Sequence, residues 1–197
     1  LLHKQIQQPV NLSIRQGDEI VYVERAYSER SGMQVVRAIG GHAPLHLTSN
    51  GKLFLAADDP QNVRSYAMRT GLSGNTHNSL TQLPQLEREL AKARQTGIAY
   101  DNEELELGVR CMAAGIYDDQ GKLVAALSIS APADRLDDSW LPKLKSCAHH
   151  ISAALGFQVD FLPTMFLTIS SFPMTIRFMK YRYTRTGSDV RSAILIS

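Results

Sequence analysis

Two β-hairpin patterns, one near each end of residues 1–156, restrict the fold more than any other feature. Residues 109–117 and 122–130 are two apolar, strand-like runs that flank the turn sequence Asp-Asp-Gln-Gly. Near the N-terminus, Val10, Leu12 and Ile14 alternate with polar residues before Gln-Gly-Asp, and a second apolar run follows at 20–23. Strands joined by tight turns run antiparallel, so the sequence predicts an antiparallel sheet.

Helical patterns separate the two hairpins. We expect a further strand at 33–39 and then helices at 47–57, 60–70 and 84–96, with a last helix from about 140 to 155. Asp59 and Pro60 are typical of a helix start, and Gly71 and Gly97 are typical of helix ends. Strands, then helices, then strands indicate an α+β fold.

Composition excludes several classes of protein. The chain has 197 residues, 20% of them charged, and a net charge of +2, which does not indicate a nucleic-acid binder. Its two cysteines, Cys111 and Cys147, are too few for a disulfide framework or a Cys-rich zinc site, and they favour a cytoplasmic location. The sequence has neither an 18-residue apolar run nor a signal-peptide pattern, so no membrane span is expected.

The composition changes sharply after Gly156. Residues 157–197 contain five of the six phenylalanines, with five basic and two acidic residues, a net charge of +3. We therefore predict a domain at 1–156 and an atypical tail at 157–197 that is non-native or disordered. The alternative is a basic segment that binds a surface or a partner.

Several polar segments are candidates for a site. Thr48-Ser49-Asn50 opens a helix, where unpaired N–H groups bind anions or are simply capped. The acidic run 101–106 precedes Cys111 and fits a metal site, an acid–base pair, a pocket wall or a solvated loop. Ser128 and Ser130 share one strand face, which either lines a pocket or meets solvent.

Two kinds of chemistry remain as alternatives at this stage. Cys111 would be a nucleophile if Asp101 or a histidine acted as its base, but no nucleophile signature surrounds it, and a core or pocket thiol is the simpler interpretation. His42 and His46, with the acidic run, would form a metal-binding module. Pro44 lies between these histidines, so they are not a helical metal pair.

Three segments together resemble the effector-binding domain of IclR-type transcription regulators. They are Gly-Gly-His-Ala-Pro-Leu-His-Leu-Thr-Ser-Asn-Gly-Lys-Leu-Phe-Leu-Ala (40–56), Asp-Asn-Glu-Glu-Leu-Glu-Leu-Gly-Val-Arg-Cys-Met-Ala-Ala (101–114) and Leu-Ser-Ile-Ser-Ala-Pro (127–132). The resemblance covers residues 1 to about 156. It implies a GAF-like fold, a curved antiparallel sheet of about six strands flanked by helices. It also implies an N-terminal winged helix-turn-helix that is missing here, so we expect the sequence to begin inside a longer regulator.

The resemblance also implies a pocket for a small organic acid. By position, backbone N–H groups would hold the acid, polar side chains would surround it, and apolar side chains would form a wall: Ser49 and Asn50 for the N–H groups; Asp101, Cys111, Ser128 and Ser130 for the polar groups; Val35, Ala43, Leu45 and Val109 for the wall. Asn50 stands where a small residue is usual, and its amide would close the pocket or add a donor. The small Val35 and Ala43 suggest a wide pocket.

The function that the resemblance implies is a ligand sensor that controls DNA binding by the missing domain. We expect no catalytic role, no cofactor, no metal and no membrane contact. We expect a homodimer or homotetramer whose contact with DNA is made only through that missing domain. A metal-binding or oligomerisation module, or a Cys-dependent enzyme, remains the alternative.

Overall fold

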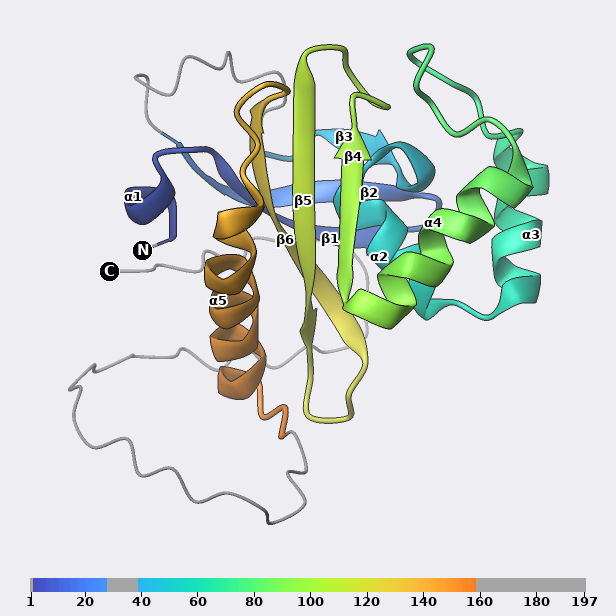
Figure 1. The fold of residues 1–197 in the computed structure, drawn as a ribbon. Coiled ribbons are helices and arrows are strands. Elements are labelled where there is room, and N and C mark those ends of the chain that lie inside the picture. The colour runs from blue at the N-terminus through green and yellow to red at the C-terminus, as the bar shows by residue number, and fades with distance from the viewer. Residues whose placement is uncertain (1, 28–38, 159–197) are drawn as a thin grey trace, which may run out of the picture. The chain divides into compact units, whose positions relative to one another are not determined.

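The centre of the molecule is a six-stranded antiparallel sheet (Figure 1). The computed structural model describes residues 2–27 and 39–158. The strands are β1 (Val10–Gln16), β2 (Glu19–Ala26), β3 (His42–Pro44), β4 (Ile98–Asn102), β5 (Val109–Tyr117) and β6 (Leu123–Pro132). Their order is β3-β2-β1-β6-β5-β4. β4 and β5 run across the direction of β1 and β2 in Figure 1, so the sheet is strongly twisted.

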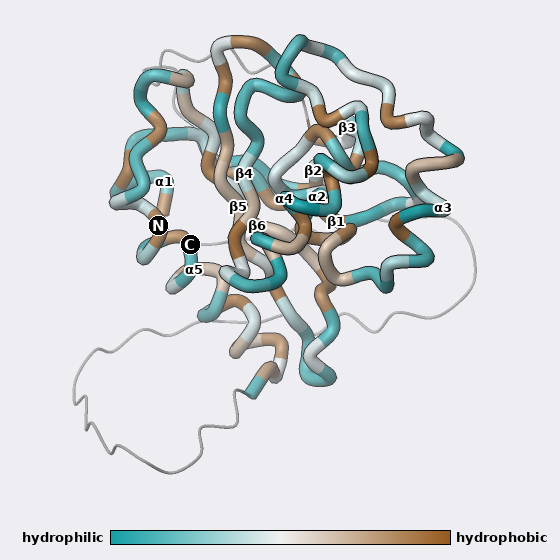
Figure 2. The backbone as a smooth tube through the Cα atoms, turned by 45° about the vertical axis from the view of Figure 1, so that its right-hand side comes forward, coloured by the Kyte–Doolittle hydropathy of each residue, from teal (hydrophilic) through white to brown (hydrophobic). Residues whose placement is uncertain are grey.

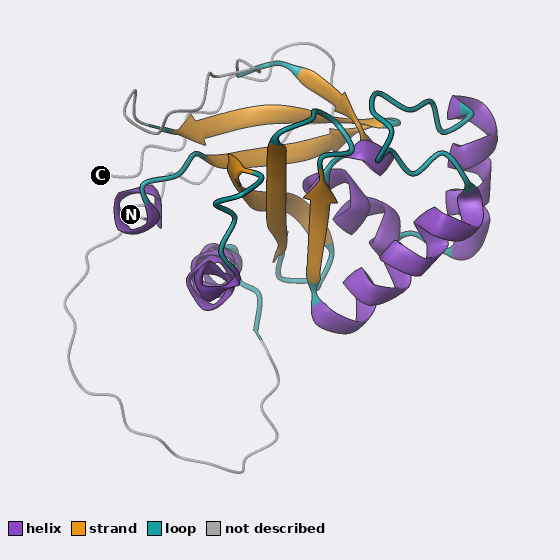
Figure 3. Cartoon of the chain, turned by 45° about the horizontal axis from the view of Figure 1, so that its top comes forward, coloured by secondary structure: helices purple, strands orange, loops and turns teal. Residues whose placement is uncertain are grey.

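Helices cover both faces of this sheet (Figure 3). They are α1 (Leu2–Ile6), α2 (Ser49–Ala57), α3 (Pro60–Thr70), α4 (Leu83–Thr96) and α5 (Leu141–Ala154), with short 3₁₀ turns at Leu45–Leu47 and Asp138–Trp140. This arrangement confirms the predicted α+β fold with about six antiparallel strands. Within residues 2–27 and 39–158, no helix has the length and apolar character needed to cross a membrane.

The sheet separates two hydrophobic cores. On one face, Leu53 of α2 and Leu86 and Leu90 of α4 pack with Ala113 of β5. On the other face, the core contains Met112, Ile116, Leu127, Ile129 and Leu144, and residues of α1 and α5 close it. Side chains alternate across a strand, so one strand supplies both cores. In Figure 2 the colour changes repeatedly along strands and helices, as expected for elements that each have a buried face.

The helix boundaries follow the capping residues. The Asp59 side chain accepts a hydrogen bond from the Asn62 N–H at 2.9 Å, and Pro60 occupies the first turn of α3. Gly71 and Gly97 end α3 and α4 in the left-handed conformation, with φ of 63° and 71°. The predicted helices at 60–70 and 84–96 are therefore confirmed to within one residue.

Two strands differ from expectation. Most of the strand expected at 33–39 lies outside the described residues and stays a prediction, although Ile39 is in a turn; the third strand of the described ranges is His42–Pro44. The strand β4 was not predicted, because its five residues lie directly after α4 and run into the acidic segment. Such a short strand is defined by its pairing with β5 rather than by its own pattern.

The last described residues extend the domain slightly beyond Gly156. The ring of Phe157 lies 5.5 Å from that of Tyr117, centroid to centroid, and the Phe157 N–H donates to the Ser152 carbonyl. Residues 159–197, which make up nearly all of the predicted tail, lie outside the described part of the chain.

Candidate functional site

A row of polar side chains crosses the sheet on the face that carries α2. In the strand pairing, Asp101 of β4 lies opposite Cys111 of β5, and Cys111 lies opposite Ser130 of β6. A neighbouring row joins Arg25 of β2 to Asn11 of β1 and Asn11 to Ser128 of β6. Directly paired residues of antiparallel strands point to the same face. The register therefore brings together polar groups from five strands.

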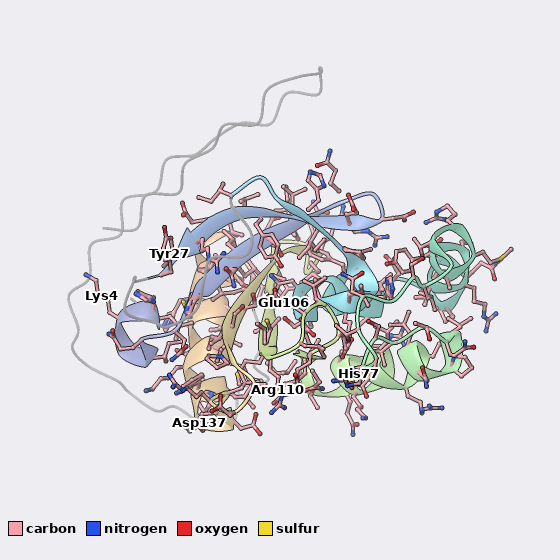
Figure 4. The ribbon with its side chains drawn as sticks, turned by 90° about the horizontal axis from the view of Figure 1, so that it is seen from above. Lys4, Tyr27, His77, Glu106, Arg110 and Asp137 are labelled. Atoms are coloured by element: carbon pink, nitrogen blue, oxygen red, sulfur yellow. The ribbon has the colours of Figure 1, made fainter. Side chains whose placement is uncertain are left out.

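These rows line a cavity of about 60 Å³ beneath the start of α2. Its walls come from β1, β2, β4, β5, β6, the start of α2 and the segment between β4 and β5; the lining residues are Asn11, Tyr22, Arg25, Thr48, Ser49, Asn50, Asp101, Leu105, Glu106, Val109, Cys111, Ser128 and Ser130. Seen from above in Figure 4, Glu106 lies near the centre of the view, whereas Tyr27 and Asp137 lie toward its edges.

The first turn of α2 supplies backbone donors to this cavity. The Thr48 side chain caps the helix by accepting from the Gly51 N–H at 3.0 Å. Ser49 and Asn50 come before Gly51, so their N–H groups have no intrahelical carbonyl to bind. Both residues line the cavity. Together with the positive end of the helix dipole, they favour an anion there.

The turn depends on Gly51. A Cβ atom on this residue would lie 2.3 Å from the Leu45 carbonyl oxygen and 2.4 Å from the Leu45 Cα atom. The absence of a side chain therefore lets α2 start directly against the preceding 3₁₀ turn, and this contact positions the donors of Ser49 and Asn50 over the sheet.

The Asn50 side chain is almost completely buried, at 1% exposure. Its Nδ2 donates to Ser13 Oγ of β1 at 2.7 Å. Its Oδ1 is buried and has no hydrogen-bond partner among the described residues. The expectation that the Asn50 amide closes the pocket or adds a donor stays a prediction; the structure shows one donor of Nδ2 bound to Ser13 and Oδ1 without a partner.

Asp101 is the most strongly perturbed acid in the cavity. Its carboxylate is 3% exposed, and Oδ1 accepts from the Glu104 N–H at 2.8 Å. Burial raises the pKa of Asp101 to about 7, and the negative charge of Glu104 adds to this shift. Asp101 therefore gains or loses its proton near neutral pH.

A buried ion pair holds the Asp101 turn against α2. Lys52 Nζ donates to Glu104 Oε1 and, at 2.7 Å, to the Tyr100 carbonyl. Burial raises the pKa of Glu104, and the charge of Lys52 opposes this effect. Both side chains are at most 4% exposed, so their charges compensate each other rather than being screened by water.

Cys111 does not have the surroundings of a nucleophile. Its Sγ lies 3.2 Å from Ser130 Oγ, which also accepts from Asn11 Nδ2 at 3.0 Å. Burial and the nearby Asp101 charge raise the pKa of the Cys111 thiol well above its usual range. A thiol that stays protonated is a weak nucleophile, so the geometry favours a pocket-wall role.

The histidines proposed as metal ligands have other partners. His46 is buried, with Nδ1 2.7 Å from the Tyr66 hydroxyl and Nε2 3.0 Å from the Ser73 carbonyl oxygen. Nδ1 of His42 lies 3.0 Å from Glu19 Oε2. Within the described ranges, no group of three or more His, Cys, Asp or Glu side chains could hold a metal ion.

Seven of the residues predicted for the site lie around the cavity, two do not, and one is outside the described residues. Ser49, Asn50, Asp101, Val109, Cys111, Ser128 and Ser130 line it. Ala43 and Leu45 lie instead in the core beneath α2, at 1% and 0% exposure. Val35 lies outside the described residues. The expectation of a wide pocket thus loses its basis at Ala43, which does not line the cavity.

Sequence reasoning missed Arg25 and Asn11. Asn11 was noted only as one of the polar residues that alternate with Val10, Leu12 and Ile14, yet it is 4% exposed and lines the cavity. The available signal was the pair Asn11 and Ser13, two small polar residues spaced like Ser128 and Ser130. Arg25 had no such signal, because its place in the cavity depends on the register of β2 against β1.

Comparison with known proteins identifies the relatives of this domain. Residues 1–153 match the family model for the bacterial transcriptional regulator IclR C-terminal domain. The chain is 35% identical to the HTH-type transcriptional repressor AllR of Escherichia coli K12 over 153 residues, 76% of this chain and 56% of AllR. The chain thus spans little more than half of the curated relatives that it matches, and these relatives are transcriptional repressors rather than enzymes.

Solved structures share the fold. The IclR protein of Thermotoga maritima is 33% identical with a TM-score of 0.73, covering 79% of this chain and 64% of that one. The inducer-binding domain of PobR from Acinetobacter, solved as a double mutant in complex with 3-hydroxybenzoic acid, is 26% identical with a TM-score of 0.71. The match covers 77% of this chain and 91% of the PobR domain.

Proposed function

The chain belongs to the IclR family of bacterial transcriptional regulators, and on this premise we propose that its cavity binds a small organic acid that controls DNA binding. The DNA would be bound by a winged helix-turn-helix domain that precedes this one in the whole protein. The observation that carries the proposal is the pair of polar rows lying beneath the unpaired N–H groups of α2.

The cavity has the groups that recognise a carboxylate. The N–H groups of Ser49 and Asn50 come from the positive end of a helix, and Arg25 brings a guanidinium group from the sheet. Burial lowers the pKa of Arg25, which indicates that an anion beside it would replace lost hydration. Cys111, Ser128 and Ser130 would contact the rest of the ligand.

The volume favours a short acid. One water molecule needs roughly 10–15 Å³ of such space, so a cavity of about 60 Å³ corresponds to a ligand of a few non-hydrogen atoms. An aromatic acid such as the one bound in PobR would require the cavity to widen.

The path from the ligand to the DNA-binding domain is short. The Ser130 N–H donates to the Pro9 carbonyl at 3.0 Å, and Asn11 contacts the Ser130 side chain. Both contacts lie within a few residues of α1, the segment nearest the N-terminus. A ligand that shifts Ser130 would therefore act directly on the start of β1. The expected assembly is a homodimer or homotetramer in the bacterial cytoplasm. Light scattering of the purified chain measures the oligomeric state.

A thermal-shift series tests the proposal. We expect glyoxylate, glycolate or pyruvate at about one hundred times Kd to stabilise the chain by about 2.7 kcal/mol, because a ligand that binds only the folded state shifts unfolding by mass action. The neutral methyl ester of each acid should give no shift. Adding 3-hydroxybenzoate tests the size limit.

Paired arginine variants separate the site from general charge effects. Arg25→Met should remove most of the shift, whereas Arg64→Met, on the exposed face of α3, should leave it intact. Equal shifts for acids and esters, or no shift with any acid, would contradict the proposed function.

A further inference from the structure

The unpaired oxygen of Asn50 restricts the chemistry of the ligand more than the rest of the cavity does. Asn50 is 1% exposed and lines the cavity, and its Oδ1 is buried without a hydrogen-bond partner among the described residues. Its Nδ2 donates to Ser13 Oγ at 2.7 Å, so Oδ1 is the amide atom that has no partner. Buried polar groups in folded proteins almost always have partners, because leaving one unpaired costs about 1–3 kcal/mol.

The surrounding groups do not supply that partner. Asn11 Nδ2 donates to Ser130 Oγ, and the Lys52 ammonium is held by Glu104 and the Tyr100 carbonyl. A ligand in the cavity is therefore the natural source of a donor for Asn50 Oδ1.

The position of this donor on the ligand follows from covalent geometry. The backbone N–H and the Oδ1 atom belong to the same residue, and standard bond lengths place N and Oδ1 about 3–4 Å apart. A carboxylate held by the Asn50 N–H thus has its neighbouring carbon within reach of Oδ1. An anionic oxygen beside Oδ1 would be repelled, whereas a hydroxyl or N–H group would be attracted.

We infer that the effector carries a hydroxyl or N–H group on the carbon next to its carboxylate, and that Asn50 Oδ1 accepts a hydrogen bond from that group. This inference rests on the proposed function and restricts the class of ligand. The ligands are acids with a hydroxyl or N–H group on the carbon next to the carboxylate, as in glycolate and oxamate, rather than simple carboxylic acids. Asn50 is the residue that determines this specificity.

Two pairs of nearly isosteric acids test the inference by calorimetric titration of the unmodified chain. Glycolate and propionate differ by a hydroxyl in place of a methyl group, and oxamate and pyruvate differ by an NH₂ in place of a methyl group. The expected result is that the donor-bearing acid binds on the order of tenfold more tightly in each pair, because the methyl group leaves Oδ1 unpaired.

Two variants attribute the preference to Asn50. Asn50→Leu should abolish it in both pairs, since leucine has a similar shape and no acceptor. Asn50→Asp should retain it, because a carboxylate still accepts the donor, although both members of each pair should bind more weakly beside the added charge. Circular dichroism checks that each variant is folded.

The outcomes distinguish this inference from the proposed function. Equal affinities within both pairs would overturn the inference while leaving acid binding intact. A preference for glycolate without one for oxamate would mean that Asn50 presents its NH₂ group, which also overturns it. A failure of all four acids to bind would overturn both the inference and the proposed function.

Discussion

At the scale of single residues, the cavity combines a positive anchor with an acid that titrates near neutrality. Arg25 and the N–H groups of α2 attract a carboxylate, whereas the Asp101 charge repels one. Because burial raises the pKa of Asp101 to about 7, the protonation state of this residue determines how strongly the cavity attracts a carboxylate near neutral pH. Acid binding should therefore weaken as the pH rises through neutrality.

The same shift makes stability depend on pH. The folded chain holds a proton on Asp101 up to about pH 7, whereas the unfolded chain releases it near the reference pKa of 3.8. The stabilisation is therefore complete below that reference value and is lost as the pH rises through 7. We expect the wild type to lose about 2 kcal/mol relative to Asp101→Asn between about pH 5 and pH 7.

Urea unfolding of both proteins at several pH values measures this difference. Asparagine keeps the acceptor for the Glu104 N–H, so the variant should fold, and the pH dependence of other groups that both proteins share cancels in the difference. Parallel stability curves for the two proteins would show that Asp101 is ionised in the folded chain at acid pH, contrary to the prediction.

The Lys52–Glu104 pair predicts strong coupling between two substitutions. Lys52→Met alone leaves the Glu104 carboxylate buried without its cation, and should reduce the free energy of unfolding by about 3–5 kcal/mol. The double variant Lys52→Met, Glu104→Gln removes both charges and should recover a large part of this loss. A double-mutant cycle by chemical denaturation measures the coupling, and additive effects would contradict it.

At the scale of elements, the contact between α2 and the preceding 3₁₀ turn depends on one missing side chain. Alanine favours helix over glycine by about 1 kcal/mol, so propensity alone predicts that Gly51→Ala stabilises the chain. The contact with the Leu45 backbone predicts the opposite, a loss of about 1–3 kcal/mol, because neither backbone segment can move without disturbing the core.

Thermal unfolding of Gly51→Ala measures this competition. Ser65→Ala on the exposed face of α3 is the control and should change stability by less than about 0.5 kcal/mol. Gly51→Ala should also bind acids more weakly, since displacing the start of α2 moves the N–H donors of Ser49 and Asn50. An increase in stability would show that the turn is not closely packed.

The elements also show what the sequence can and cannot predict. Helices α3 and α4 were located to within a residue, because Asp59, Gly71 and Gly97 act on their own neighbours in the chain. Strand β4 was missed because its partner β5 defines it. Asp101, Cys111 and Ser130 were assigned to one site by resemblance, and their alignment in one row depends on pairings that no local pattern encodes.

Polar residues on strands raised the same difficulty. The sequence did not decide whether Ser128 and Ser130 face a pocket or solvent. In the structure they are buried, at 3% and 8% exposure, and Leu127 and Ile129 lie in the core on the opposite face of the sheet. In a strand that is buried on both faces, buried residues do not alternate with exposed ones. Hydropathy therefore cannot reveal that one of its two buried faces is a polar cavity.

At the scale of the whole molecule, the described fold is complete at Gln158. All six strands and both cores lie before this residue, and Phe157 adds a ring contact with Tyr117. We expect a chain ending at Gln158 to unfold at the same temperature as the full chain and to bind acids with the same affinity.

Differential scanning calorimetry of the two chains checks this expectation. Truncation before Phe157 provides a comparison, and it should lower the melting temperature slightly by removing the ring contact. A large loss of stability or binding on truncation at Gln158 would show that residues 159–197 belong to the functional unit.

The polar rows have a further consequence for how such a sensor diversifies. Five of the six strands contribute one or two residues each to the rows, and the backbone pairing that aligns them does not depend on which side chains they carry. A substitution at Asn11, Cys111 or Ser130 alters the side-chain hydrogen bonds of the rows while the backbone pairing stays in place. The side chains that face the cavity can therefore vary from strand to strand while the sheet that holds them keeps the same pairing.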